Sequence, residues 1–177
     1  MNPIAADVTV LSLGILVARL VLGLLMAAHG AQKLFGWFGG HGIEATGGYF
    51  ESMGFRPARQ MAMLAGFTEV AGGLLMALGL LGPIGPAMVF AVMIVAGATH
   101  VRRGVFAANN GIEVPLLYAT GAVAIALTGP GAISLDAFLG IQVWNPFLAV
   151  TALSVGALGA LFNLVARQSP LNRTANG

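Results

Sequence analysis

Long hydrophobic stretches dominate this chain and alternate with shorter links that are polar or rich in glycine. Five of the stretches are apolar enough over a sufficient length to predict helices that cross a membrane. They cover residues 8–28, 61–81, 84–101, 112–128 and 146–166. The fourth is the shortest, and Pro115 falls in its first turn, where a missing N–H is harmless. The pattern therefore predicts an all-α membrane protein.

The links between the predicted spans differ in length and character. A Gly-Pro pair joins the second and third spans in a tight turn, which makes them an antiparallel hairpin. The first link is long and contains a weakly amphipathic piece, 43–53, for which we predict a lid or a half-buried helix at the membrane surface. In the fourth link, Ser134 is placed to cap a short interfacial helix.

The composition supports a membrane protein and excludes several other classes. Hydrophobic residues make up 58% of the 177 residues, charged residues only 8%, and the mean hydropathy is +0.89. Soluble domains carry about 25% charged residues. The net charge of +2 is too small to indicate a nucleic-acid partner. The chain has no cysteine, which excludes disulfides, thiolate metal sites and a thiol active site, and we predict no metal.

Lysine and arginine are distributed unevenly among the links. With five spans, seven of the eight basic residues fall on one side of the membrane: Lys33, Arg56, Arg59, Arg102, Arg103, Arg167 and Arg173. This asymmetry predicts a multi-pass protein of the cytoplasmic membrane with its N-terminus outside and its C-terminus in the cytoplasm. The basic rim is interpreted either as charge that meets lipid headgroups or as a site for an anionic substrate or a soluble partner.

Two charged residues lie deep inside predicted spans, away from their ends. Arg19 lies near the middle of the first span, where an uncompensated charge costs roughly 2.5 kcal/mol or more. Glu69 is at a similar depth in the second span if the two spans are antiparallel, and small residues on its face allow a neighbouring helix to approach closely. We therefore predict an Arg19–Glu69 ion pair, which either holds the two helices together or takes part in chemistry.

Two histidines terminate predicted spans on the same side of the membrane. Neutral His29 and His100 could hold a quinone oxygen, relay a proton or ligate a haem, or they could simply bond to water or backbone at the interface. A bis-histidine haem is the least favoured of these, because both rings would have to point at one plane. The predicted ligand-binding set is Arg19, His29, Lys33, Glu69 and His100.

Several motifs occur in an order that resembles the DoxX family of small membrane proteins. They are Arg19-Leu20, His29 through Gly36, Phe50 through Gly54, Glu69 with Gly72-Gly73, His100, Gly129-Pro130-Gly131, and Ser134-Leu135-Asp136. The resemblance covers about residues 12–140. It implies a four-helix membrane bundle over residues 1–140, which leaves residues 141–177 as a C-terminal extension with a fifth span.

The resemblance also suggests a function, because the family takes its name from a subunit of an archaeal thiosulfate:quinone oxidoreductase. We expect a redox-associated membrane subunit that binds a quinone in the bundle and acts with a partner oxidoreductase. Arg19 and Glu69 would polarise or protonate the head group, with His29, Lys33 and His100 at the cytoplasmic mouth. The alternatives are a non-enzymatic scaffold that anchors a redox or respiratory partner and a small-solute transporter. Whether the chain is itself an enzyme stays open.

Overall fold

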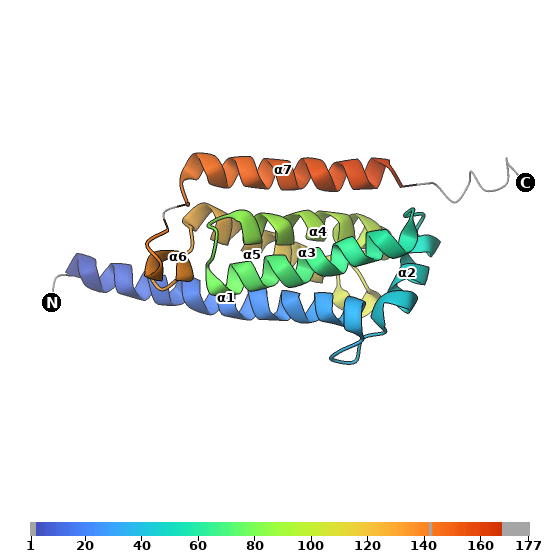
Figure 1. The fold of residues 1–177 in the computed structure, drawn as a ribbon, viewed down its shortest axis with the longest axis horizontal. Helices are drawn as coiled ribbons and strands as arrows, with labels where there is room; N and C mark the ends of the chain where they lie inside the picture. Colours follow the sequence, from blue (N-terminus) through green and yellow to red (C-terminus); the bar gives the residue numbers. More distant parts are fainter. Residues whose placement is uncertain (1–2, 142, 168–177) are drawn as a thin grey trace, which may run out of the picture.

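The structure is a computed structural model that describes residues 3–141 and 143–167. Within these residues it is entirely helical (Figure 1), which confirms the predicted fold class. The α-helices are α1 (Pro3–Phe35), α2 (Gly42–Ser52), α3 (Ala58–Leu78), α4 (Ile84–His100), α5 (Glu113–Thr128), α6 (Leu135–Phe138) and α7 (Pro146–Val165). Two short 3-10 segments, η1 (Val101–Arg103) and η2 (Ala107–Asn109), lie between α4 and α5.

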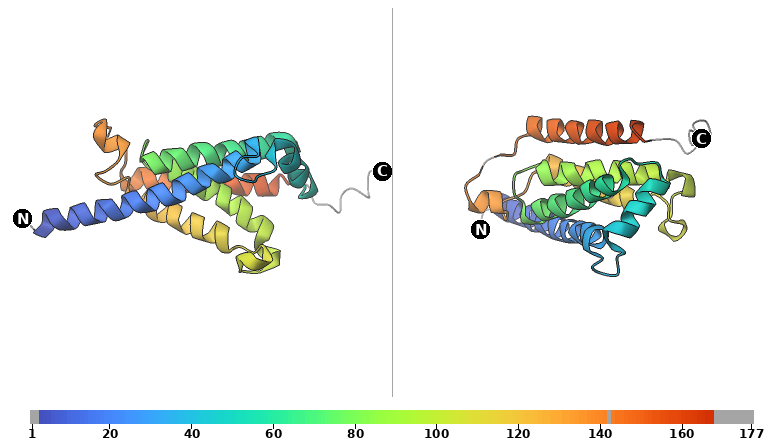
Figure 2. Two further views of the ribbon diagram at one scale, coloured as in Figure 1. Left: turned by 90° about the horizontal axis from the view of Figure 1, so that it is seen from below. Right: turned by 45° about the vertical axis from the view of Figure 1, so that its right-hand side comes forward.

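Five helices run along the length of the bundle, while two short ones lie at its ends. In Figures 1 and 2, α2 lies across the end at which α7 finishes, and α6 lies at the opposite end. Helices α1, α3, α4 and α7 are each long and apolar enough to cross a membrane. Helix α5 has 16 residues, so it rises only about 24 Å along its axis. Each predicted span is therefore a helix, and the fourth is indeed the shortest.

The contact between α1 and α3 is made by glycine. A Cβ atom added to Gly23 would lie 2.5 Å from the carbonyl oxygen of Gly73, and one added to Gly30 would lie 2.5 Å from that of Gly66. Real Cβ atoms do not approach that closely, so the two backbones touch where a larger residue would separate them. The predicted close approach along the small-residue faces is confirmed, and these contacts fix the register of the two helices.

The two links predicted to contain short helices both do so. Helix α2 occupies the amphipathic piece of the first link. In the fourth link, the Ser134 hydroxyl oxygen accepts a hydrogen bond from the Ala137 N–H at 3.2 Å and caps α6 as predicted. Each short helix covers one end of the bundle, so each end is built from an interhelical link as well as from the long helices (Figure 1).

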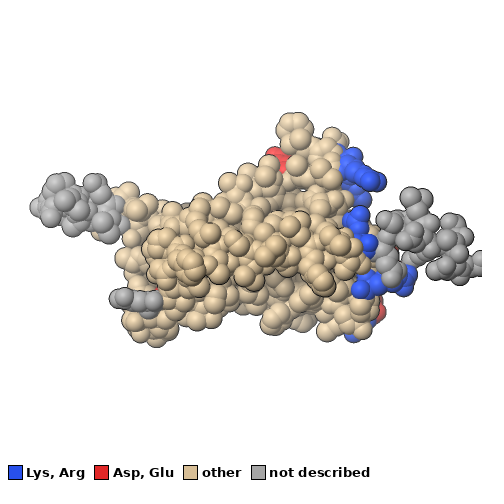
Figure 3. Space-filling view, turned by 90° about the horizontal axis from the view of Figure 1, so that it is seen from above, with Lys and Arg blue, Asp and Glu red and all other residues tan. Residues whose placement is uncertain are grey.

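Basic side chains gather at one end of the molecule. Figure 3 shows lysine and arginine at the end where α7 finishes, while the remaining described surface of that view is almost free of charge. The basic residues at this end lie in the first link and in η1, and Arg167 follows α7 closely. The predicted one-sided distribution is therefore found among the described residues. Arg173 lies outside them, and the orientation in the membrane stays a prediction.

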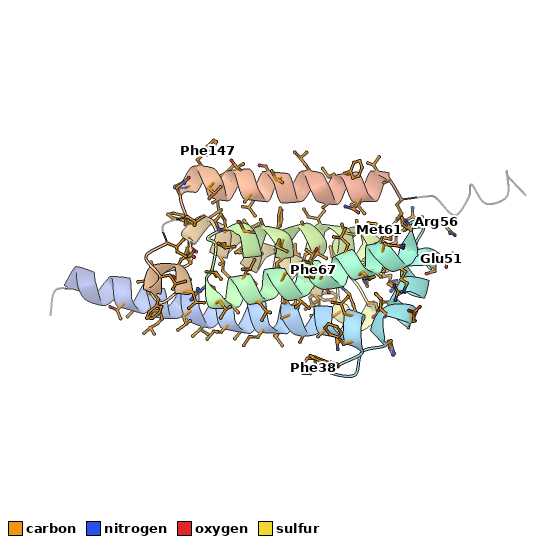
Figure 4. The ribbon with its side chains drawn as sticks, in the orientation of Figure 1. Phe38, Glu51, Arg56, Met61, Phe67 and Phe147 are labelled. Atoms are coloured by element: carbon orange, nitrogen blue, oxygen red, sulfur yellow. The ribbon has the colours of Figure 1, made fainter. Side chains whose placement is uncertain are left out.

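Large apolar side chains cover the outside of the bundle. Phe67 in the middle of α3 and Phe147 at the start of α7 both point away from the neighbouring helices (Figure 4). Other exposed apolar residues lie on the outer faces of α1 and α7: Val17, Val21, Leu24, Val155, Leu158 and Phe162. Soluble monomers seldom expose such continuous apolar area. This surface is suited to hydrocarbon, as expected of a multi-pass membrane protein in contact with the lipid bilayer.

Candidate functional site

The predicted ion pair between Arg19 and Glu69 is wrong. The Arg19 guanidinium donates a hydrogen bond to the Ile133 carbonyl oxygen at 2.5 Å, whereas Glu69 forms its ion pair with Lys33. The register of α1 and α3 explains the error. Because Gly23 faces Gly73 and Gly30 faces Gly66, Glu69 comes opposite a position about 12 Å along the axis from Arg19. Position within each hydrophobic stretch had suggested equal depth.

Arg19 instead stabilises the end of the bundle that carries α6. We call this the outer end and the opposite end the inner end, after the orientation that the sequence predicts. Its side chain is buried, with only 1% of the residue exposed, and it packs against Gly79 at the end of α3. Two of its guanidinium nitrogens, Nε and Nη1, have no hydrogen-bond partner among the described residues. Gly79 has a φ of +63°, and a Cβ there would overlap the guanidinium. The acidic residue that interacts electrostatically with Arg19 is Asp136 in α6. An acidic group does face Arg19, as expected, but it comes from the fourth link.

Asp136 was not among the predicted site residues, yet it is one of the most buried charges, with 3% of the residue exposed. Its carboxylate accepts hydrogen bonds from the N–H groups of Leu81 at 2.9 Å and Gly82 at 2.7 Å, in the turn between α3 and α4. The sequence offered one signal for Asp136: it lies in the fourth link, on the side predicted to face outward, where few other acidic residues are available to balance Arg19. Arg19 and Asp136 thus hold the fourth link across the outer end.

Glu69 lies in the middle of α3, nearer to the inner end of the bundle than Arg19. Its side chain is 1% exposed, and Oε1 accepts a hydrogen bond from the Lys33 ammonium, whereas Oε2 has no hydrogen-bond partner among the described residues. Lys33 reaches it from the last turn of α1, because helical side chains lean toward the N-terminus of their helix. A carboxylate oxygen buried without a partner is costly, which makes this atom a strong candidate for ligand contact.

A cavity of about 210 Å³ opens beside Glu69, and we call it the head cavity. Four of the five predicted ligand-binding residues line it together: His29, Lys33, Glu69 and His100. Arg19 does not. The walls are completed by apolar residues of α1, α4 and α5 and by the loop between α4 and α5. The structure therefore assembles most of the predicted set in one place, without the residue that was expected at its centre.

The aromatic and imidazole rings around the head cavity have fixed partners. His29 Nδ1 lies 3.1 Å from Gln32 Oε1, and the His29 ring meets the Tyr118 ring edge-on at 5.8 Å. His100 Nδ1 lies 2.7 Å from the Asn110 carbonyl oxygen. Both histidines are thus oriented by neighbours near the mouth, where one nitrogen of each ring is already engaged. Such rings can bind a polar group or relay a proton.

Tyr118 is the site residue that sequence reasoning missed at this end. It is buried in α5, lines the head cavity and interacts electrostatically with Glu69. The signal was a tyrosine within an apolar helix, since a buried hydroxyl usually finds a polar partner. The head cavity therefore offers a carboxylate, an ammonium, two imidazoles and a phenol inside an otherwise apolar wall, a set able to hold and protonate a polar head group.

Comparison with known proteins identifies a family match over half of the chain. The DoxX family model matches residues 14–102, a range that includes Arg19, His29, Lys33, Glu69 and His100. The Gly129–Asp136 motifs lie beyond the match, as do α5 and α7. No curated protein and no solved structure matches the chain.

Proposed function

Since the chain belongs to the DoxX family of membrane proteins, we propose that it is a redox-associated subunit that binds a quinone in the head cavity. One observation carries the proposal: the buried Glu69 carboxylate lines this cavity with one oxygen paired to Lys33 and the other without a partner. A ligand that donates to or accepts a proton from that oxygen would satisfy it. The apolar walls suit the ring of a quinone.

Quinone reduction explains why titratable groups would be needed in such a cavity. One quinone takes up two electrons and two protons to become a quinol, and the protons must reach both oxygens in a site shielded from bulk water. Glu69 and Lys33 are placed to supply protons, and His29 and His100 lie on the route from the polar end. A partner oxidoreductase supplies the electrons. Because the chain lacks cysteine, any thiol chemistry also belongs to that partner.

The distribution of charge supports a location for this reaction. Basic residues at the end that carries α2 favour that end as the cytoplasmic one (Figure 3). The protein would then lie in the cytoplasmic membrane with the mouth of the head cavity on the cytoplasmic side and α6 on the outer side.

Ligand binding by the purified protein tests the proposal. We expect a short-chain ubiquinone analogue to raise the unfolding temperature of the protein in detergent, and Glu69→Gln to weaken its binding about tenfold or more, since a charged hydrogen bond is lost. Glu44→Gln is the matched control, because Glu44 is an exposed carboxylate paired with Arg59. Absence of any quinone effect, together with absence of quinone in extracts of the protein from native membranes, would overturn the proposal.

A scaffold that anchors a partner protein is the second candidate. It is favoured by Arg102 and Arg103, which are exposed on η1 and form no ion pair among the described residues. Free guanidinium groups at the end of a membrane bundle can bind an acidic protein surface. A stoichiometric partner that co-purifies with the native protein and is lost in the variant with both arginines changed to alanine would support this role. An unchanged yield of partner would contradict it.

A further inference from the structure

The head cavity is the first of three cavities that follow one another through the molecule. The second, about 260 Å³, lies under α2, and its wall shares Lys33, Ala96 and His100 with the head cavity. The third, about 220 Å³, lies between α7 and the pair α3 and α4. We call these the α2 cavity and the α7 cavity. Their walls have five residues in common: Phe50, Phe55, Ala65, Val92 and Val95.

The head cavity has the most polar wall in this row, and the other two are mainly apolar. The charged groups stand at the head cavity, and the α2 cavity adds hydroxyl groups from Thr46, Tyr49 and Thr99. The α7 cavity is lined mostly by hydrocarbon, with Thr68 and Asn163 among its polar residues. One of its polar groups, the Asn163 amide, already donates to the Gly159 carbonyl oxygen of its own helix at 2.9 Å. A molecule that filled the row would be polar at one end and apolar over the rest of its length.

We propose that the α2 and α7 cavities bind the hydrocarbon tail of the ligand whose head lies at Glu69. The inference rests on the proposed function and specifies its substrate class, which is a quinone with a long apolar tail rather than a small water-soluble quinone. The head cavity alone is smaller than the roughly 300 Å³ at which ligand pockets begin, whereas the row as a whole leads from charged groups to a surface that faces lipid.

The packing of α7 against α4 leaves open space in the α7 cavity, at the end of the row farthest from Glu69. α7 touches α4 at Gly156, where an added Cβ would lie 2.9 Å from the Ala87 carbonyl oxygen, but one turn later an added Cβ at Gly159 meets no atom within 4 Å. Met61, at the start of α3, forms part of the opposite wall on the side that faces α7 (Figure 4). The end of a tail would enter or leave the bilayer through this crevice.

Phe50 and Phe55 stand at the junction between the α2 and α7 cavities. Their ring centroids are 5.3 Å apart, and both rings belong to the walls of both cavities. Ala65 completes the junction from α3 with a side chain that leaves room for a tail. A larger side chain at position 65 would close the row at its middle and leave the head cavity, which it does not line, unaltered.

The test compares two quinones with the same ring, one with a ten-carbon tail and one without a tail. We expect the unaltered protein to bind the tailed probe at least tenfold more tightly, because each buried methylene adds affinity. Ala65→Leu should remove most of that advantage and change the affinity for the tail-less probe less than twofold. Gly159→Leu fills the far end at a position with free space, so it serves if Ala65→Leu fails to fold. Gly14→Leu is the matched control, because its Cβ also meets no atom and it lines none of these cavities.

The outcomes separate this inference from the proposed function. Equal affinity for the two probes, or a tailed probe that binds Ala65→Leu and Gly159→Leu as tightly as it binds the unaltered protein, would overturn the tail site while head binding still stood. Binding of neither probe would overturn both. Co-purified phospholipid that the tailed quinone fails to displace, with its loss in Gly159→Leu, would assign the α7 cavity to a bilayer lipid and likewise overturn the tail site.

Discussion

Both ends of the bundle bury charged side chains, but the surroundings of these side chains differ. At the outer end, Arg19 and Asp136 are both buried: one Arg19 nitrogen donates to the Ile133 carbonyl oxygen, and the Asp136 carboxylate accepts from the Leu81 and Gly82 N–H groups. The other two guanidinium nitrogens of Arg19 have no hydrogen-bond partner among the described residues. At the inner end, Glu69 is equally buried and also has an atom without a partner, its second oxygen, but here a cavity lies beside the charged group. A charged residue inside a membrane protein therefore indicates either a structural contact or a ligand-binding site. Glu69 is assigned to the candidate site because it lines the head cavity.

This difference also explains why the predicted set divided as it did. Arg19 was expected to act on a ligand, yet its place in the structure is between Gly79 and the fourth link, where it braces a loop. Lys33 was expected at the mouth of the site, and it lines the head cavity with its ammonium paired to the buried Glu69 carboxylate. Glu69 therefore pairs with Lys33 at the candidate site, whereas Arg19 contacts the fourth link at the outer end.

The largest effect is expected from a substitution that disrupts the contacts of the fourth link at the outer end. Asp136→Ala removes the acceptor of the Leu81 and Gly82 N–H groups and the charge that faces Arg19, so we expect the free energy of unfolding to fall by about 3–5 kcal/mol. Thermal unfolding in detergent measures this effect. Asp136→Asn keeps one oxygen and should lose less. An Asp136→Ala protein as stable as the unaltered one would show that the outer end is not held in this way.

A second change breaks the register that separates the two ends. Gly73→Leu places a side chain against the backbone of α1 at Gly23, and overpacking of this kind costs about 1–3 kcal/mol. Gly14→Leu, in open space on the outer face of α1, should stay within about 0.5 kcal/mol. The same unfolding assay applies. Equal stability of the two variants would mean that α1 and α3 do not touch at these glycines.

A third set of substitutions tests whether a second substitution restores the stability lost in the first, at each end of the bundle. Lys33→Met leaves the Glu69 carboxylate buried without its partner, and we expect a loss of about 1–3 kcal/mol. Adding Glu69→Gln removes the charge and should recover at least about 0.5 kcal/mol. At the outer end, adding Asp136→Asn to Arg19→Met should recover less, because the Leu81 and Gly82 donors still need an acceptor. A double-mutant cycle at each end measures both couplings, and equal recovery would contradict the contrast.

The smallest effect is expected at the basic rim. Arg102→Ala with Arg103→Ala should change the free energy of unfolding by no more than about 0.5 kcal/mol, because both side chains are exposed on η1. The same variant should keep its full affinity for quinone, since neither residue lines the head cavity. A quinone titration alongside the melting curve checks both points. A large loss in either would show that the rim belongs to the site rather than to the surface around it.

The sequence by itself determined the features that depend on neighbours along the chain. The length and hydrophobicity of each stretch predicted the helices, Ser134 predicted the cap of α6, and the asymmetry of lysine and arginine predicted which end would be basic. The motifs that run from Arg19 to His100 were enough to identify the family. These are local properties, because a helix satisfies its own backbone hydrogen bonds and a cap acts within one turn.

Only the tertiary structure decided which buried charge meets which. The backbone contacts of Gly23 with Gly73 and of Gly30 with Gly66 set a register that no single span contains. That register moves Glu69 away from Arg19 and toward Lys33. The burial of Asp136 under the outer turn and the row of cavities that reaches α7 likewise depend on segments far apart in the chain. A shift of two helical turns is invisible to hydrophobic patterning, yet it decides where the candidate site lies.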